Sequence, residues 1–279
     1  MSSPSEIIVD ARGRIFAPLH PPFRIVSLVP SITELLFDLG LGMGEIVGRT
    51  KFCVHPHDRV RSVPAVGGTK TVDVKKVRNL LPDLVIANID ENQREVVDEI
   101  ESGDNPIPVV VTHPRNPLDA LGMVRDFGIL FGTGARADTL IGRIKESIDA
   151  ITGAREGRAL YLIWRKPYIT VSPDTYIHGI LSLVGYSNAI DERWLLSREF
   201  ASTGARRYPM LTARDIAELA PDIVLFSSEP FPFKQQHIDE FLLMYNKSGS
   251  RPPRCSLVDG ELFSWYGTRI INLPGIQLG

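Results

Sequence analysis

The sequence predicts an α/β protein in which two lobes, each built on a parallel sheet, are joined by one long helix. Short β-branched and aliphatic runs alternate with helix-compatible segments along most of the 279 residues, which is typical of a parallel sheet covered on both faces. A long amphipathic segment interrupts the alternation once, near the middle. We expect an N-terminal α/β lobe at 1–132, a connecting helix at 133–157 and a C-terminal α/β lobe at 158–279.

The N-terminal lobe opens with the run RIVSLV at residues 24–29, followed directly by a predicted helix. Ser31 and Glu34 have the spacing of a capping box, and Gly40 is placed to end this helix. Further strands are expected at residues 45–50, 84–88 and 108–113, with helices at 73–81, 91–102 and 117–131.

The connecting helix is predicted from one apolar stripe. Its members step by four, three, four and three residues: Ala137, Ile141, Ile144, Ile148 and Ile151. A helix of roughly 20 residues would be about 30 Å long.

The C-terminal lobe repeats the plan of the first. DVKKVRNLLPDLVIAN in the first half and TARDIAELAPDIVLFS in the second are each a helix that stops before Pro-Asp, followed by a buried strand. Other elements of this lobe are expected at RALYLIW, DTYIHGILSLVG and RCSLVDG. The similarity indicates two lobes of one design.

Composition bounds the class of protein. Hydrophobic residues make up 43% and charged residues 23%, and the net charge is −2, so a nucleic-acid-binding surface is not expected. No apolar run is long enough to insert into a membrane, and the N-terminus lacks the features of a secretory signal, so a cytosolic location is expected. Cys53 and Cys255 are expected to be free thiols.

The strand ends carry most of the unusual chemistry, and ligands of open parallel sheets bind outside these ends. Aromatic and charged side chains gather there in the second half, as suits a large, flat, amphipathic ligand held by stacking and a few polar contacts. The candidate ligand-binding residues are Lys70, Glu91, Asn92, Trp164, Arg165, His178, Glu229, Phe231, Phe233, Trp265, Tyr266 and Arg269. Glu91 can equally favour the first turn of a helix, and His178 can be an axial metal ligand or a structural histidine.

The stretch FCVHPHD offers Cys53, His55 and His57 as ligands for a protein-bound metal. A zinc site needs three or four such side chains aimed at one point. The alternative is a loop that packs Cys53 inward and lines the rim of a binding cleft.

Several motifs in order, FCVHP, GGTK, IWRKP, TYIH, SSEPFPF and SWYG, together with RIVSLVPSITELLFDLG and PDLVIAN, resemble the helical-backbone metal receptor superfamily. These are the class III periplasmic binding proteins, which serve transporters for cobalamin, siderophores and haem, and the resemblance is closest to the cobalamin-binding branch. It implies two Rossmann-like lobes with parallel sheets joined by one long α-helix. It also implies a non-enzymatic protein that binds a corrinoid or other metal chelate in the interlobe cleft and requires no cofactor of its own.

One departure from the family concerns its ABC permease partner. Members that dock onto a permease present a surface carboxylate from each lobe, and the corresponding places here fall near Lys75 and Arg214, which are basic. Such charges would repel the arginines of a transporter. This puts a permease partner in doubt.

Two alternatives stay open at this stage. The first is a cytosolic metal-dependent or cysteine-dependent enzyme that uses Cys53, His55 and His57. The second is a transport component whose export signal is missing from the sequence as given, which would place the protein in the periplasm or at the cell surface.

Overall fold

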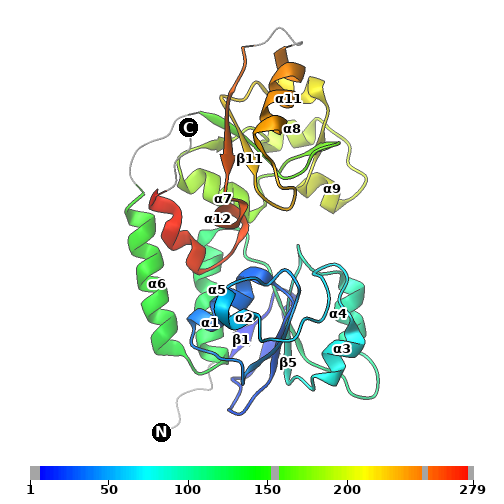
Figure 1. Ribbon diagram of the computed structural model, residues 1–279, viewed down its shortest axis with the longest axis vertical. Coiled ribbons are helices and arrows are strands. Elements are labelled where there is room, and N and C mark those ends of the chain that lie inside the picture. The colour runs from blue at the N-terminus through cyan, green and yellow to red at the C-terminus, as the bar shows by residue number, and fades with distance from the viewer. Residues whose placement is uncertain (1–6, 152–156, 247–250, 276–279) are drawn as a thin grey trace. The chain divides into compact units, whose positions relative to one another are not determined.

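The computed structural model describes residues 7–151, 157–246 and 251–275 (Figure 1). The chain divides into two compact units, and the main division falls inside helix α6, Gly134–Asp149, between Lys145 and Glu146. Unit 1 precedes this point and also takes in Tyr266–Thr268, whereas unit 2 follows it and also takes in Arg115–Pro117. Each unit has its own parallel sheet, which confirms the predicted α/β class.

Unit 1 is built on a four-stranded sheet in the order β4, β3, β5, β6, with every neighbouring pair parallel. The strands are β3 (Ile25–Ser27), β4 (Ile46–Arg49), β5 (Leu84–Asn88) and β6 (Val109–Thr112). All residues of β3, β5 and β6 are buried, as expected for strands covered on both faces.

Helices cover both faces of this sheet. Figure 1 shows α3 (Val74–Asn79) and α4 (Arg94–Ile100) on one side, and α1 (Pro30–Asp38) and α5 (Pro117–Leu130) on the other. Val77 of α3 and Ile100 of α4 pack in one core cluster with Val85 of β5 and Val109 of β6. A fifth, four-residue helix, α2, spans His57–Val60.

The predicted capping box of α1 is wrong. The helix begins at Pro30, its N-cap is Val29, and no side chain caps it, so Ser31 lies within the first turn. Proline is favoured at the first helical position because its fixed φ suits the helix and its missing N–H costs nothing there. Here that preference places the start of the helix ahead of the Ser31 signal.

An unpredicted hairpin borders the sheet of unit 1. Strands β1 (Ile8–Val9) and β2 (Ile15–Phe16) pair with each other, and Ala11 donates from its backbone N–H to the carbonyl of Val111 in β6 at 2.8 Å. The Asp10 carboxylate accepts the N–H of Val111 at 3.2 Å. The hairpin therefore satisfies backbone groups on an edge strand that would otherwise be open to pairing with another chain.

Unit 2 repeats the sheet of unit 1. Its order is β12, β11, β7, β9, all parallel, with the strands β7 (Arg158–Leu162), β9 (Ser187–Asn188), β11 (Ile223–Ser227) and β12 (Arg254–Val258). In both units the first strand pairs with the second on one side and with the third on the other, and the fourth lies outermost. The internal similarity seen in the sequence is therefore a shared topology.

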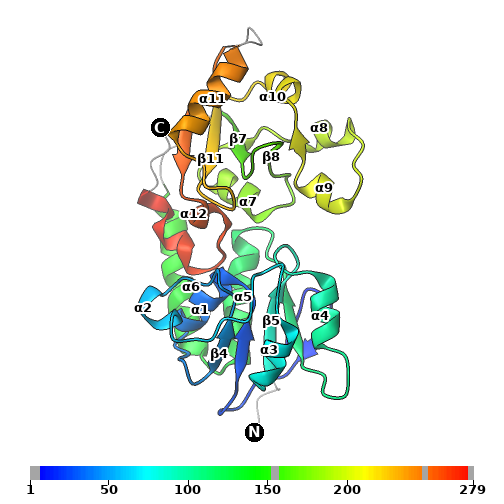
Figure 2. The ribbon, with the colours of Figure 1, turned by 45° about the vertical axis from the view of Figure 1, so that its right-hand side comes forward.

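Two layers of helix also enclose the sheet of unit 2 (Figure 2). Helices α10 (Ala213–Leu219) and α11 (Gln235–Asn246) pack on one face, where Ile216 and Phe241 share a cluster with Phe226. On the other face Tyr161 of β7 contacts Phe263 of α12 (Gly260–Ser264), with ring centroids 5.1 Å apart. The remaining elements are α7 (Tyr176–Leu183), α8 (Glu192–Leu196), α9 (Thr203–Arg207), the pair β8 (Tyr168–Ile169) and β10 (Met210–Leu211), and a 3₁₀ helix at Thr268–Gly275.

A turn that contains Pro-Asp joins α3 to β5 in unit 1 and α10 to β11 in unit 2. This turn, the Pro-Asp corner, is built in the same way in both units. In unit 1, Leu81 has a positive φ of 47°, and the Asp83 carboxylate accepts the backbone N–H of Arg24 at 2.7 Å. The Arg24 guanidinium returns to the carbonyl of Leu80 at 2.8 Å, which satisfies a free carbonyl at the end of α3.

The corner of unit 2 matches it group for group. Ala220 has a φ of 42°, Asp222 accepts the N–H of Arg158 at 2.7 Å, and the Arg158 guanidinium donates to the carbonyl of Leu219 at 2.7 Å. The predicted repeat therefore extends to hydrogen bonds at the start of the first strand of each sheet.

The connecting helix is shorter than predicted. Ala137, Ile141 and Ile144 of the stripe are buried in α6, but the helix ends at Asp149, so its 16 residues span about 24 Å. Ile151 lies beyond its end, and residues 152–156 of the predicted helix lie outside the described residues. Across the described ranges, no helix has the length and apolarity to cross a bilayer.

Candidate functional site

Two aromatic side chains meet at the strand ends of unit 2. Trp164 follows β7 and Phe231 follows β11, and these strands are neighbours in the sheet. The ring centroids lie 5.7 Å apart with the planes at 72°, an edge-to-face contact. Trp164 is 41% exposed, a large fraction for the largest apolar side chain. The pair forms an aromatic platform that a ligand can reach.

Core residues hold Phe231 of the platform in place. Phe231 contacts Phe233 at 4.8 Å and His237 at 5.2 Å between centroids, and Phe233 contacts Phe226 of β11 at 5.2 Å. Phe233 is only 6% exposed. The structure therefore places Phe233 in the core, where it supports Phe231.

Arg165 adds a positive charge at the edge of this platform. Its guanidinium carbon lies 5.9 Å from the centroid of the Phe231 ring, within reach of a cation–π contact, and it forms an ion pair with Glu240 of α11. The arginine side chain is 13% exposed. It is therefore held in a defined place, beside the aromatic rings.

A second group of predicted residues forms a polar network after β11 and α12. One carboxylate oxygen of Glu229 accepts from the Ser264 hydroxyl at 2.6 Å and from the Trp265 indole N–H at 3.0 Å. The Arg269 guanidinium lies 5.0 Å from the Trp265 ring centroid and pairs with Glu261 at 3.0 Å. Trp265 is 6% exposed, so this network fixes the tryptophan inside the protein.

The environment of Glu229 disfavours its charge. Burial raises the pKa of Glu229, and the negative charges of Glu261 and Asp259 add to the rise, while the hydrogen bonds from Ser264 and Trp265 oppose it. The folded state therefore holds the proton of the Glu229 carboxyl more tightly than the unfolded chain does. The stability that protonated Glu229 contributes is present below pH 4.5 and is lost as pH rises through the raised pKa.

We expect Glu229→Gln to remove this pH dependence, because glutamine keeps an oxygen for Ser264 and Trp265 but does not ionise. In urea unfolding at several pH values, the free energy of unfolding of the variant relative to the wild type should increase from pH 4.5 upward. Glu95→Gln, an exposed change in the first turn of α4, is the control and should track the wild type. Parallel curves for Glu229→Gln and the wild type would contradict the expectation.

Two further predicted residues lie apart from the platform group. Tyr266 is 5% exposed and belongs to unit 1, whereas Trp265 beside it belongs to unit 2. His178 lies in the first turn of α7, where its backbone N–H is capped by Thr175 at 3.3 Å. Burial lowers the pKa of His178, and among the described residues its buried Nδ1 has no hydrogen-bond partner. Burial therefore favours the neutral form of this imidazole.

In unit 1 the predicted residues gather beyond β5. The Lys70 ammonium donates to the carbonyl of Asp90 at 2.7 Å. Burial lowers the pKa of Lys70, and the carboxylates of Glu91 and Asp90 act in the opposite direction. Asn92 is buried, and its amide contacts three backbone groups: the N–H of Asn88 and the carbonyls of Leu28 and Thr69. Asn92 thus positions the loop that carries Lys70.

The proposed metal ligands do not converge, which contradicts a metal bound by Cys53, His55 and His57. Cys53 is 1% exposed, and its sulfur contacts the hydroxyls of Thr33 at 3.0 Å and Thr50 at 3.2 Å. His57 is exposed and lies 3.7 Å from Asp58. Within residues 7–151, 157–246 and 251–275, no three His, Cys, Asp or Glu side chains are grouped to hold a metal ion. The inward packing of Cys53 is confirmed.

The cysteine-dependent alternative meets the same geometry. Burial raises the pKa of the Cys53 thiol, and this effect exceeds the lowering of the pKa by hydrogen bonds with Thr33 and Thr50. The reactive thiolate is therefore disfavoured. A nucleophilic cysteine needs a base in contact, whereas this sulfur contacts the hydroxyls of two threonines. Both cysteines are free thiols, as predicted.

One pair of strand-end residues was not singled out from the sequence. His113 follows β6 and Asp90 follows β5, and the imidazole Nε2 lies 3.8 Å from the Asp90 carboxylate. Both side chains are largely buried, at 21% and 13% exposed. Their position directly after adjacent parallel strands is the signal that could have identified them.

The comparisons with known proteins agree with this architecture. The sequence profile of the family described as periplasmic binding protein matches residues 25–243. The chain is 28% identical over 228 residues to the uncharacterized ABC transporter substrate-binding lipoprotein YvrC of Bacillus subtilis. The aligned region covers 78% of this chain and 68% of that protein. This chain is also 23% identical over 233 residues to the vitamin B12-binding protein of Vibrio cholerae, and that alignment covers 77% of this chain and 74% of that protein.

Solved structures show the same fold. A periplasmic heme binding protein from Pseudomonas aeruginosa aligns with a TM-score of 0.72 and 19% sequence identity, over 91% of this chain and 90% of that chain. At this level of identity the likeness concerns the fold, and one fold can carry different ligands.

Proposed function

We propose that this chain, which belongs to the periplasmic binding protein family, is a solute-binding protein that binds a corrinoid or another metal chelate. Its relatives include a vitamin B12-binding protein, and a heme binding protein shares its fold. Both ligands are large, flat rings that carry a metal and polar substituents.

The observation that carries the proposal is the platform of Trp164 and Phe231 with Arg165 at its edge. Two aromatic rings 5.7 Å apart offer apolar contact area, and a guanidinium can pair with a carboxylate, phosphate or amide oxygen on the rim of a macrocycle. Because Phe231 is packed on core rings, little ordering is required when a ligand binds.

A ligand screen tests this function. We expect cyanocobalamin, cobinamide, haemin or a ferric siderophore to raise the free energy of unfolding, by about 2.7 kcal/mol at roughly 100 times its dissociation constant. Visible absorbance reports the same event independently, because these chelates absorb and their spectra respond to a change of environment. The absence of both a thermal shift and a spectral change with all four would reject the proposal.

We propose binding without catalysis. The rival enzyme required either a metal at Cys53, His55 and His57 or a reactive Cys53 thiolate, and the geometry around the buried sulfur supports neither. No cofactor is proposed beyond the ligand itself.

A permease partner is suggested by the name of the Bacillus subtilis relative. Lys75 and Arg214 occupy equivalent places, each being the second residue of its helix, α3 and α10, and both are exposed. Arg214 pairs with Glu218 at 2.7 Å. A permease that docks at these places would need acidic groups there, so we assign no permease to this chain.

Two cellular locations are to be distinguished: the cytosol, which the sequence predicts, and the membrane, which the name of the Bacillus subtilis lipoprotein suggests. Fractionation of cells that express the native gene, with marker proteins for each compartment, decides between them. Recovery with the membrane or exported fraction would overturn the cytosolic prediction.

A further inference from the structure

The outer edge of β12 is open in unit 2, whereas the matching edge of unit 1 is covered. Both β12 and β6 are the fourth strand of their sheet, and each lies outermost beside the third strand. In unit 1 the hairpin of β1 and β2 borders β6, and every residue of β6 is buried. In the described part of unit 2, β12 pairs with β11 alone, and four of its five residues are half-buried or exposed.

Two residues of β12 direct their backbone groups to this open edge. The N–H of Arg254 and the carbonyl of Val258 form hydrogen bonds of 3.0 and 2.9 Å to the residues that flank β11. Successive residues of a strand direct their backbone groups to opposite sides. Cys255 and Leu257 therefore point their N–H and C=O groups away from β11. The hydroxyl of Ser256 approaches the carbonyl of Leu257 only to 3.4 Å, a long contact for a hydroxyl donor.

The side chains at this edge also suit pairing with another strand. Leu257 is 43% exposed, and Cys255, two residues before it on the same face, packs partly buried against the core cluster of α10 and α11. Edge strands that stay unpaired are commonly blocked by lysine, by proline or by a β-bulge. The strand RCSLV contains neither residue, and its pairing with β11 is regular from end to end.

We propose that two copies of this chain pair in antiparallel orientation through β12, with Cys255 of one copy opposite Leu257 of the other. In this register each such pair exchanges two N–H···O=C bonds, so the outward groups of both strands are satisfied. The side chains of Cys255 and Leu257 then meet on one face of the joined sheet, and Ser256 lies opposite Ser256 of the second copy on the other face.

Charge favours a second copy as the occupant of this edge. In the proposed register Arg254 lies opposite Val258 of the second copy, and Asp259 follows Val258 directly. Arg254 and Asp259 are both exposed, so opposite charges meet at each end of the paired strands. The twofold symmetry of such a dimer repeats the contact at the other end. A parallel alignment in register would instead set Arg254 beside Arg254.

The size of the contact predicts a reversible dimer. Five residues from each copy take part, whereas about 20 to 30 residues a side form a stable complex. We therefore expect a dissociation constant on the order of 10 to 100 µM.

Sedimentation velocity of the full chain under reducing conditions, over a range of concentrations, tests the proposal. We expect the wild type to pass from monomer to dimer. Leu257→Lys should weaken dimerisation at least about 10-fold, because two ammonium groups would then lie near the twofold axis. Leu243→Lys, the same change at a 68% exposed leucine on α11, is the matched control and should dimerise like the wild type.

A disulfide tests the register. Leu257→Cys places a thiol opposite Cys255 of the second copy, where the Cα atoms of a hydrogen-bonded antiparallel pair lie about 5.5 Å apart, within the range of a disulfide. Oxidation with copper phenanthroline should then give a covalent dimer on non-reducing electrophoresis. Leu243→Cys is the control and should form far less of it.

Three results would overturn the proposal: a wild type that stays monomeric up to about 1 mM, equal dimerisation of the wild type and Leu257→Lys, or equal crosslinking of Leu257→Cys and Leu243→Cys. A synthetic peptide with the sequence PRCSLVD, tested alongside, separates a second copy from a free strand. Binding of that peptide by a chain that stays monomeric would assign the edge to an extended segment of another protein and reject the dimer.

Discussion

Trp164→Ala is expected to weaken chelate binding by about 1 to 2 kcal/mol, or roughly 5- to 30-fold in the dissociation constant, with little change in the free energy of unfolding. The side chain is 41% exposed and contacts Phe231 edge to face, so its removal takes away ligand contact area while the core rings stay packed. Titration of the chelate found in the screen, followed by absorbance, measures the first quantity, and urea unfolding measures the second.

Leu196→Ala is the matched control for this variant. Leu196 is also a large exposed apolar residue of unit 2, at 80% exposed, but it lies at the end of α8. Its loss should leave affinity unchanged. Equal affinities of the wild type and Trp164→Ala for the chelate would remove the platform from the binding site, even if the protein binds the chelate elsewhere.

The buried strands were predictable because their environment leaves a clear pattern. A strand covered on both faces reads as a continuous apolar run, and LVIAN coincides with β5, Leu84–Asn88. Helix limits were less predictable, since Ser31 and Pro30 gave competing signals for the start of α1. The end of α6 at Asp149 was missed because an apolar stripe continues in the sequence beyond the point where the helix stops.

The site was predictable in its residue types but not in its contacts. Trp164 and Phe231 were both assigned to strand ends, yet their contact depends on β7 and β11 being neighbours. That order is set by long-range pairing, which local patterns do not encode. The shared topology of the two units supplies the missing rule, since in both sheets the first strand lies beside the third.

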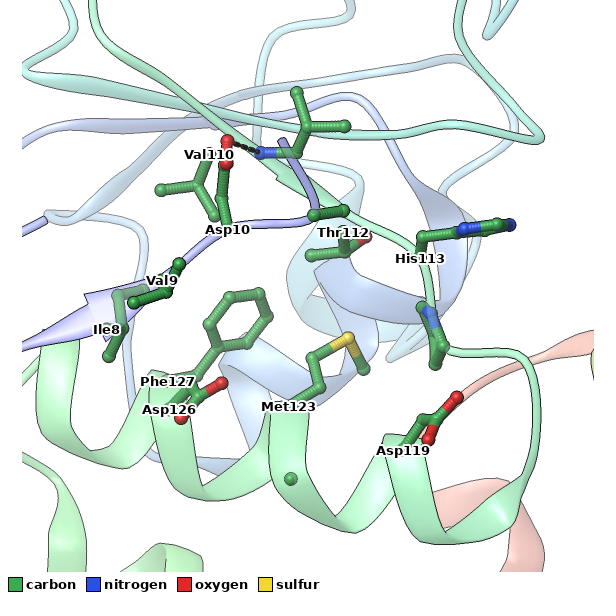
Figure 3. Close-up of a pocket in the computed structure, with 14 residues that line it drawn as sticks. Ile8, Val9, Asp10, Val110, Thr112, His113, Asp119, Met123, Asp126 and Phe127 are labelled. Carbon is green, nitrogen blue, oxygen red and sulfur yellow. Dashed lines mark hydrogen bonds between the residues drawn. The ribbon is translucent and has the colours of Figure 1, made fainter. Parts of the chain in front are cut away.

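Unit 1 contains a cavity of about 210 Å³ between β1 and α5, lined in part by Val9, Met123 and Phe127 (Figure 3). This cavity could not be anticipated from the sequence. Part of its wall is the hairpin of β1 and β2, whose strands have two residues each and give no periodic signal. A cavity formed by a short irregular segment against a regular helix is therefore recognised only in three dimensions.

Gly67→Ala is expected to destabilise unit 1 by about 2–4 kcal/mol. Gly67 has a φ of 120°, and an added Cβ would overlap the carbonyl oxygen of Thr71 and lie 3.1 Å from the backbone nitrogen of Asp73. Backbone atoms cannot move aside as a flexible side chain can, so the turn that carries Lys70 must distort.

The measurement for Gly67→Ala is urea unfolding followed by circular dichroism. Gly44→Ala is the control, because a Cβ there meets no atom within 4 Å and its φ is not positive, so a change below about 0.5 kcal/mol is expected. The contrast separates the backbone requirement of the GGTK turn from the general effect of replacing glycine, which reduces the entropy of the unfolded chain in both variants. If Gly67→Ala unfolds like Gly44→Ala, the turn accommodates a side chain and its role in positioning Lys70 is lost.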